Sequence, residues 1–363
     1  MVVTLAVVRS LGTAHRLGSV QALEDFEQEL VDQYALACAG AGITDRHITE
    51  ERSVIFCFLR FSARPIWEAT PEIADRFLVH QRKELGLARA TVVRKAQTLA
   101  GFYDFLIFRY QGDVHALTGH VLVQPIDEYN RPANASGQVI RVPPREDEIE
   151  RLFAIWRESL PQARKFLPAA CDYMAASLWR RVGLRISETV NLDIRDWRPD
   201  LGEYGKLHVR FGKGSRGKGP KTRLVPAIES VDALVTWWLT DIRHQFGDDW
   251  DDPDAPLLPS ERRDKMTGHG QRAGADALRS GLAGVVGEYL PAWRGRLTPH
   301  VLRHYCASSL YMRGMDLKAI QELLGHSWLS TTTRYIHVHS DHIENAWAQA
   351  NDRVAARLSA GGG

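Results

Sequence analysis

Cysteine is scarce in this 363-residue chain, which holds only four: Cys38, Cys57, Cys171 and Cys306. They are widely separated, and none forms a CxxC pair or another spacing typical of metal ligands. A disulfide framework and a cysteine metal site are therefore excluded. Since all four lie in apolar stretches, we expect reduced thiols in the core of an intracellular protein.

Long apolar runs are also lacking. The apolar stretch near the start, residues 2–8, is too short to span a membrane. It also lacks the basic leader and the cleavage site of a signal peptide. We therefore expect a soluble, cytoplasmic protein that does not bind membranes.

The net charge is low, at +2 for 46 basic and 44 acidic residues, so total charge does not indicate a nucleic-acid partner. Only the distribution of charge along the chain can carry that argument. The apolar content of 44% is ample for buried cores. A chain of this length predicts two domains, with room for an additional arm.

The first third of the chain has the 3.6-residue periodicity of amphipathic helices. We predict helices over residues 20–39, 52–61, 71–85 and 90–108. Three basic residues, Arg89, Arg94 and Lys95, accompany the last of these helices. Their side chains form either a solvated helix face or a face that contacts phosphates.

The middle of the chain separates these helices from a mixed region. Residues 127–144 are rich in Asn, Pro, Gly and Ser, have no periodicity and are typical of an interdomain linker. A helix is predicted over 145–159, with acidic residues in its first turn. Strands are predicted over 207–211 and 223–225. The acidic run 248–254 is predicted to be an exposed loop.

A basic, glycine-rich turn joins the two predicted strands. From residue 205 to residue 226 no acidic residue occurs, and glycines let the backbone approach a polyanion closely. Such a hairpin is a fair signal for nucleic acid. It is not a Walker loop, because the GxxxxGKS/T order is absent. Its basic residues include Lys213, Arg216, Lys218, Lys221 and Arg223.

The segment around Arg185 forms a predicted corner between two helices. Gly183 ends one helix and Ser187 lies where the next begins, so Arg185 is held at the corner. Glu188, three residues on, can orient or balance it. The alternative is a solvated ion pair in an ordinary helix–helix turn.

A second cation lies at a helix start. Thr298 and Pro299 predict the beginning of a helix. His300 and Arg303 then share one face near its N-terminus, where backbone N–H groups favour an anion. This is either a phosphate site or a capped surface helix with incidental charges.

Five motifs occur in one order: GLRISE, the glycine-rich hairpin ending in KTRLVP, HVLRH, LLGHS, and a tyrosine nine positions after the last histidine. In this order and spacing they resemble the tyrosine recombinase (phage integrase) family. The resemblance is specific over about residues 145–338. The N-terminal helices are similar to the family's core-binding domain in topology only.

The resemblance implies an active site. Arg185 and Arg303 match the family's two arginines, which can clamp the oxygens of the cut phosphate and stay charged at any working pH. Glu188 matches the supporting acidic residue. Tyr335 matches the nucleophile, whose phenol has a reference pKa of about 10 and needs help to lose its proton.

The remaining matches concern proton transfer. His300 is a candidate general base, and His326 is a candidate hydrogen-bond donor to the phosphate. Lys213 matches the hairpin lysine, which the resemblance implies protonates the departing 5′ oxygen. A second GKG, centred on Lys218, departs from the family pattern and leaves the choice of lysine open. We favour Lys213 because it directly follows the strand. Tyr305 stands where the family often has a small hydroxyl residue, and we expect it in the core.

The implied product is a 3′-phosphotyrosyl link that stores the bond energy, so rejoining needs no ATP. The sequence has no carboxylate cluster suited to two Mg²⁺ ions, and we expect no metal and no other cofactor. A metal site in the His-rich segment 337–342 is conceivable, but such a run is usually not one.

The implied fold is mainly α with a small β-sheet (α+β). A helical core-binding domain and a mixed α/β catalytic domain would form a C-shaped DNA clamp. We expect an N-terminal arm or extra helix at 1–44, the core-binding domain at 45–126, a linker at 127–143, the catalytic domain at 144–340, and a C-terminal helix and tail at 341–363.

The implied partner is double-stranded DNA with specific recombination sites. We expect a homo-tetramer on synapsed DNA and a monomer free in solution, with accessory DNA-bending or directionality factors as further candidate partners. The expected location is the cytoplasm, in association with the nucleoid.

Three other functions compete with recombination. A type IB topoisomerase-like enzyme would use similar chemistry to nick and close one duplex. A non-catalytic DNA-binding regulator would keep the fold, but it would have no reason to retain a phenol and an acid–base set. A metal hydrolase built on the His-rich segment is disfavoured because no HExxH motif occurs.

Removing the C-terminal segment tests the implied assembly. Ile343, Trp347, Val354 and Leu358 line one stripe of a predicted helix, which packs either on its own domain or on a neighbouring protomer. On the second interpretation, deletion from Ile343 onward abolishes synapsis in a gel-shift assay but leaves single-site DNA binding intact. Recombination at a normal rate by the truncated protein would contradict it.

Overall fold

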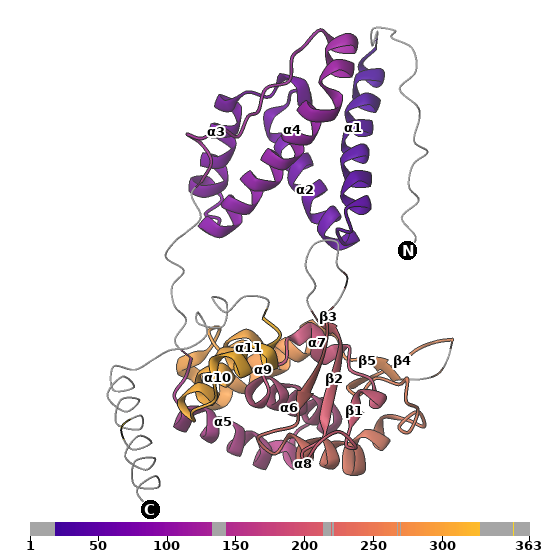
Figure 1. Ribbon diagram of the computed structural model, residues 1–363, viewed down its shortest axis with the longest axis vertical. Coiled ribbons are helices and arrows are strands. Elements are labelled where there is room, and N and C mark those ends of the chain that lie inside the picture. Colours follow the sequence, from indigo (N-terminus) through magenta and orange to yellow (C-terminus); the bar gives the residue numbers. More distant parts are fainter. Residues whose placement is uncertain are drawn as a thin grey trace, which may run out of the picture. The chain divides into compact units, whose positions relative to one another are not determined.

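The computed structural model describes residues 19–132, 143–212, 221–266 and 270–326, together with the single positions 219, 268 and 351. These residues divide into two compact units: residues 19–132 belong to the first, and residues 143–212, 221–266 and 270–326 belong to the second (Figure 1). Each unit has its own hydrophobic core. Most of the described residues are helical and the sheets are small, so the predicted fold class, mainly α with a small β-sheet, is confirmed.

The first unit is entirely helical. Its helices are α1 (Val20–Gly40), α2 (Asp45–Ser62), η1 (Ile66–Glu68), α3 (Pro71–Val79), η2 (His80–Glu84) and α4 (Arg89–Thr118). The four helices expected here are confirmed, with three differences. Helix α2 begins at Asp45 and not at residue 52. The helix expected over 71–85 is α3 followed by a π-helical turn, η2. Helix α4 continues to Thr118, where Gly119 takes the left-handed conformation (φ 77°) that ends a helix.

Aromatic side chains fill the core of the first unit. Phe58 packs edge-on against Phe77, with 5.3 Å between the ring centroids. The buried hydroxyl of Tyr103 donates to the carbonyl of Ile66 at 3.0 Å, which satisfies a polar group that would otherwise be costly to bury. Leu30 of α1 is fully buried in this core, so α1 packs as part of the unit.

The second unit combines helices with a small antiparallel sheet (Figure 1). Its helical elements are α5 (Glu146–Ser159), η3 (Leu160–Gln162), α6 (Phe166–Arg181), α7 (Ile186–Val190), η4 (Ile194–Asp196), α8 (Val231–Trp237), η5 (Trp238–Ile242), η6 (Arg243–Phe246), α9 (Ala275–Tyr289), η7 (Pro291–Trp293), α10 (Pro299–Met312) and α11 (Leu317–Leu324).

Two sheets complete the second unit. The strands β1 (Trp197–Arg198), β2 (Lys206–Gly212) and β3 (Lys221–Pro226) form one sheet in that order, and β4 (Pro259–Arg263) pairs with β5 (Gly270–Arg272). Both strands expected from the sequence are confirmed as β2 and β3. Val209 pairs with Arg223 and Gly212 with Lys221, so β2 has one residue more than β3 between these pairs and forms a β-bulge.

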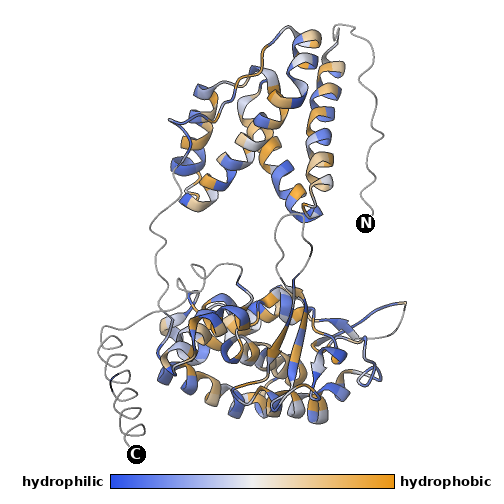
Figure 2. Ribbon diagram, viewed as in Figure 1, coloured by the Kyte–Doolittle hydropathy of each residue, from blue (hydrophilic) through white to orange (hydrophobic). Residues whose placement is uncertain are grey.

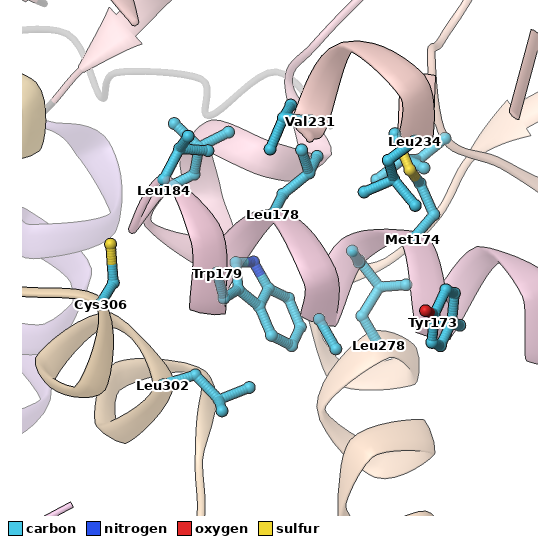
Figure 3. Close-up of a cluster of buried hydrophobic side chains, with 14 of the residues drawn as sticks. Tyr173, Met174, Leu178, Trp179, Leu184, Val231, Leu234, Leu278, Leu302 and Cys306 are labelled. Atoms are coloured by element: carbon cyan, nitrogen blue, oxygen red, sulfur yellow. The ribbon is translucent and has the colours of Figure 1, made fainter. Parts of the chain in front are cut away.

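Helix α6 runs through the core of the second unit. Its residue Trp179 points toward α10, where Leu302 lies, whereas Leu178 and Met174 point toward Val231 and Leu234 of α8 (Figure 3). The indole N–H of Trp179 donates to the hydroxyl of Thr189 at 2.9 Å, which ties α6 to α7. In both units apolar and polar residues alternate along the helices, as one-sided burial requires (Figure 2).

The sequence predicts an exposed loop over 248–254, but one residue of this segment is buried. Asp249 is buried and accepts a hydrogen bond at 3.2 Å from Arg243, which is itself fully buried. A buried guanidinium is stable only beside an opposite charge, so the carboxylate of Asp249 is buried together with Arg243.

The state of the cysteines and the lack of a long apolar helix agree with what the sequence predicts. All four cysteines are free thiols; three are buried, and Cys57 is half-buried. Among the described helices, none combines the length and the apolar character needed to cross a bilayer.

Asp172 of α6 generates a prediction about stability. Its carboxylate lies against α9, where a Cβ on Gly281 would meet it at 2.0 Å, and burial raises its pKa to about 7. Because the folded state holds the proton more tightly than the unfolded state, this group lowers stability as pH rises from about 4 to 7. Asp172→Asn should therefore raise Tm at pH 8, by roughly 2–4 °C for each kcal/mol gained.

At pH 5 the carboxyl of Asp172 is largely protonated in the folded chain, so the same substitution should change Tm much less. Thermal unfolding at both pH values measures the difference. An equal change in Tm at pH 5 and pH 8 would contradict the burial argument.

Candidate active site

Four residues predicted to act together meet in the second unit. Arg185 donates to Glu188 at 2.7 Å, and Arg303 lies 3.9 Å from the same carboxylate. Arg303 also contacts the ring of His326, with 3.0 Å between the two nitrogens. These residues come from α7 and its N-cap, from α10 and from the turn after α11, so the fold gathers them from distant parts of the chain.

A tight corner between α6 and α7 places Arg185. Gly183 has a φ of +62°, and a Cβ there would lie 2.4 Å from Leu324 and 3.2 Å from the sulfur of Cys306. Only glycine satisfies both the backbone conformation and this close approach. Arg185 is the N-cap of α7, and its backbone N–H donates to Glu188 at 2.8 Å.

Glu188 is the centre of the cluster and is almost completely buried. Besides Arg185, it accepts two hydrogen bonds of 2.8 Å from Arg223. Burial alone would raise the pKa of Glu188, but hydrogen bonding and the charge of Arg223, followed by those of Arg185, lower it to about 2. The carboxylate therefore stays ionised at any working pH.

Arg223 was predicted to contact DNA, but its guanidinium is bound to protein groups inside the site. Both ends of its guanidinium are bound to Glu188, and its Nε donates to the carbonyl of Leu323 at 3.0 Å. Its side chain is only 12% exposed. A direct DNA contact by Arg223 stays a prediction, while the geometry favours a role in holding Glu188. Sequence spacing showed its charge but not its partner, 35 residues away.

The same three arginines hold the C-terminal end of α11. Arg185, Arg223 and Arg303 donate to the carbonyls of residues 323–325 over distances of 2.5 to 3.4 Å. These carbonyls have no partner within the helix and carry its partial negative charge, so cations stabilise them. The arginines thereby hold the turn that presents His326.

His326 is buried and electrically neutral. Burial, followed by the positive charges of Arg303 and Arg185, lowers its pKa to about 3. Because Arg303 can only donate, the Nε2 of His326 accepts the hydrogen bond between them, and the ring proton resides on Nδ1. The residue is thus a neutral hydrogen-bond donor at working pH.

His300 lies at the start of α10, where the hydroxyl of Thr298 caps the helix by accepting from the N–H of Val301 at 3.3 Å. His300 is exposed, and its ring packs edge-on against His304 at 4.7 Å. Arg303, in contrast, is buried. The two residues predicted to share a face therefore differ in their access to solvent.

The other predicted site residues fall into two groups. Lys213, Arg216, Lys218 and Tyr335 lie outside the described residues, as do the His-rich segment and all of the expected C-terminal helix except position 351. The second group, which the structure describes, consists of Arg89, Arg94, Lys95, Lys221 and Tyr305.

Arg89 and Lys221 are exposed, and Arg94 is exposed with a 3.4 Å contact to Glu50. Lys95 is half-buried, and its ammonium donates to Gln81 at 2.5 Å. These four remain predicted DNA contacts. The geometry of Lys95 favours a structural role, since its charge is directed toward a buried amide.

Tyr305 is buried in the core, as expected. Burial, followed by the charges of Glu150 and Glu146, raises its pKa to about 12, so it is a poor nucleophile in this position.

The charges of the described cluster suit a phosphate. Three guanidiniums surround one carboxylate, and the imidazole beside them is neutral, which leaves an excess of positive charge. Such an arrangement can bind a phosphodiester and stabilise the further negative charge that develops during transfer.

Solved structures share this fold. The integrase of transposon Tn1549, in complex with transposon right-end DNA, matches with a TM-score of 0.61 and 19% identity, over 88% of this chain and 98% of that chain. The recombinase XerH, bound to a palindromic difH substrate, matches with a TM-score of 0.60 and 19% identity, over 91% and 84%. A lambda integrase dimer bound to a COC′ core site matches with a TM-score of 0.60 and 15% identity, over 86% and 96%.

Sequence comparison then identifies the family. The tyrosine recombinase XerC of Haemophilus influenzae (strain 86-028NP) is 27% identical over 79% of this chain and 83% of its own length. The tyrosine recombinase XerD of Listeria monocytogenes serotype 4b (strain F2365) is 25% identical over 93% and 94%. The model of the phage integrase family matches residues 145–342, more than half of the chain. The chain therefore belongs to the phage integrase family, and it is a site-specific recombinase of the tyrosine type.

Replacing Glu188 tests its central place. Glu188→Gln removes the single negative charge among three guanidiniums, so we expect a loss of about 3–5 kcal/mol in the free energy of unfolding. DNA cleavage should fall as well, because Arg185 loses the group that orients it. Thermal unfolding and a cleavage assay measure the two effects.

The matched control is Asp200→Asn, which breaks an exposed ion pair with Arg198. It should leave Tm and cleavage nearly unchanged. Equal effects of the two substitutions would show that Glu188 has no special role.

Proposed function

We propose that the chain cuts and rejoins double-stranded DNA at specific sites through a 3′-phosphotyrosyl intermediate on Tyr335, without metal or ATP. The observation that carries the proposal is the convergence of Arg185, Arg303 and neutral His326 around buried Glu188. This cluster has the charge and the donors that a phosphodiester in transfer requires.

In the proposed reaction Arg185 and Arg303 bind the non-bridging oxygens of the cut phosphate, and His326 donates a further hydrogen bond. The phenolic oxygen of Tyr335 attacks phosphorus, and its proton passes to His300. The bond from phosphorus to the 5′ oxygen breaks, and that oxygen takes a proton from Lys213. Rejoining reverses these steps with a new 5′ hydroxyl. The closeness of Arg185, Arg303 and His326 supports their proposed roles, and all the roles rest on the family resemblance.

The proposed partner is duplex DNA carrying a recombination site. The solved XerH recombinase and the solved Tn1549 and lambda integrases are bound to DNA, which supports the same partner for this chain. We propose that single copies in solution assemble as a tetramer on two synapsed sites, assisted by DNA-bending or directionality factors. A DNA recombinase of this kind would act in the cytoplasm, at the nucleoid.

Tyr335 is tested with a suicide substrate, a nicked DNA site from which the released fragment diffuses away. Tyr335→Phe should bind the site normally but form no covalent adduct on a denaturing gel, because the attacking oxygen is absent. Tyr305→Phe is the matched control, since its hydroxyl is buried and its pKa is raised to about 12. It should form the adduct at close to the wild-type rate.

An adduct formed by Tyr335→Phe, or its loss in Tyr305→Phe, would contradict the assignment of the nucleophile. Relaxation of a supercoiled plasmid that lacks a specific site would instead indicate a topoisomerase.

A further inference from the structure

Arg210 lies in β2, two residues before the strand ends at Gly212, and it binds two buried carboxylates. Its guanidinium donates to the two oxygens of Asp196 at 2.7 and 2.9 Å, and it also donates to Asp193. Asp196 is 1% exposed and Asp193 is 6% exposed. Arg210 is therefore anchored from two directions at the end of its strand.

Asp193 connects this anchor to the helix of the active site. It accepts a second hydrogen bond, at 2.6 Å, from Arg272 of β5. Arg272 also donates to the carbonyls of Val190 and Leu192 at 2.8 and 3.0 Å, at the C-terminal end of α7. Through this carboxylate, strand β2 is held at a constant position relative to the helix that carries Glu188.

The β-bulge makes the direction of β2 depend on Arg210. The bulge falls between Val209 and Gly212 and therefore includes Arg210. A bulge bends its strand and increases the local twist, so the anchored side chain influences the direction of β2 up to its end at Gly212. The backbones are close at this place, since a Cβ on Gly212 would meet the carbonyl oxygen of Lys221 at 2.5 Å.

The opposite strand has a matching anchor. Arg223 of β3 pairs with Val209 in the ladder and is bound by Glu188. Carboxylates of one short segment, residues 188–196, thus hold Arg210 near the end of β2 and Arg223 near the start of β3. Buried ion pairs of this kind contribute little net stability, because desolvation offsets the attraction. Stability alone therefore does not account for them.

We infer that Arg210 is a positioning residue for proton transfer to the leaving 5′ oxygen: anchored by Asp193 and Asp196, it aims the strand that leads into Lys213. The inference rests on the proposed function, in which Lys213 supplies this proton. Arg210 does not touch the DNA in this scheme and acts only through the lysine.

The leaving group provides a selective test. When the bond from phosphorus to the 5′ oxygen breaks, the oxygen needs a proton, because the pKa of an alcohol is far above neutral. A sulfur atom in its place leaves as a thiolate, since a thiol has a reference pKa of about 8.5. A defect in proton donation disappears on the sulfur substrate, whereas a defect in phosphate binding or folding remains.

The experiment compares single-turnover cleavage of two suicide substrates, with oxygen or sulfur at the 5′ position of the cut bond. The variant is Arg210→Gln combined with Asp196→Asn, which replaces the buried ion pair by two amides. We expect cleavage of the oxygen substrate to slow roughly 10-fold or more, as small misplacements do. On the sulfur substrate the rate should return to within about twofold of wild type. Tm and single-site DNA binding are measured alongside.

Two further variants of ion pairs make the result specific. Arg210→Lys keeps the charge but loses the two-pronged contact, and it should show the same substrate dependence with a smaller defect. Arg198→Gln combined with Asp200→Asn removes an exposed pair in β1 of the same sheet. It should change neither rate.

Equal slowing on both substrates would overturn the inference, and so would an unchanged rate on the oxygen substrate. Lys213→Ala separates the two proposals. If sulfur restores Lys213→Ala but not the Arg210 variant, the inference alone is wrong. If sulfur does not restore Lys213→Ala, the proton-donor role of Lys213 in the proposed function is wrong and the inference falls with it; rescue of Lys218→Ala alone would assign that role to Lys218.

Discussion

The buried carboxylate of Glu188 is the interaction on which the site depends. Three guanidiniums, from Arg185, Arg223 and Arg303, would repel one another at this distance without it. The fold compensates with one carboxylate and with the carbonyls at the end of α11, which carry partial negative charge. An excess of positive charge remains, and a phosphate can complete the balance.

The same physical arrangement recurs beside the site. Asp193 and Asp196 hold Arg210 and Arg272 much as Glu188 holds its arginines. The carboxylates of both clusters belong to the short segment that begins at the corner after α6. This segment is itself held by the hydrogen bond between Trp179 and Thr189 and by the packing of Gly183. A small part of the chain thus aligns a helix, a hairpin and the turn after α11.

Much of the fold could be predicted because it follows from local patterns. Periodic apolar residues indicated the helices of the first unit, cap and first-turn residues indicated α5 and α10 of the second, and a glycine-rich turn between two apolar runs indicated β2 and β3. The candidate site was found because its motifs occur in the order and spacing of a known family. Sequence patterns did not find Arg223 as the partner of Glu188, nor the inward direction of Lys95. The choice of partner depends on which side chains meet after folding.

The sequence by itself determined the class of fold, the family and the identity of the candidate site residues, because periodicity, turn residues and motif order are properties of the chain alone. Only the tertiary structure decided which charges neutralise one another, that His326 is neutral, and that Arg303 is buried while His300 is exposed. Burial and electrostatic energy depend on distances between segments that are far apart in the sequence, so no local pattern encodes them.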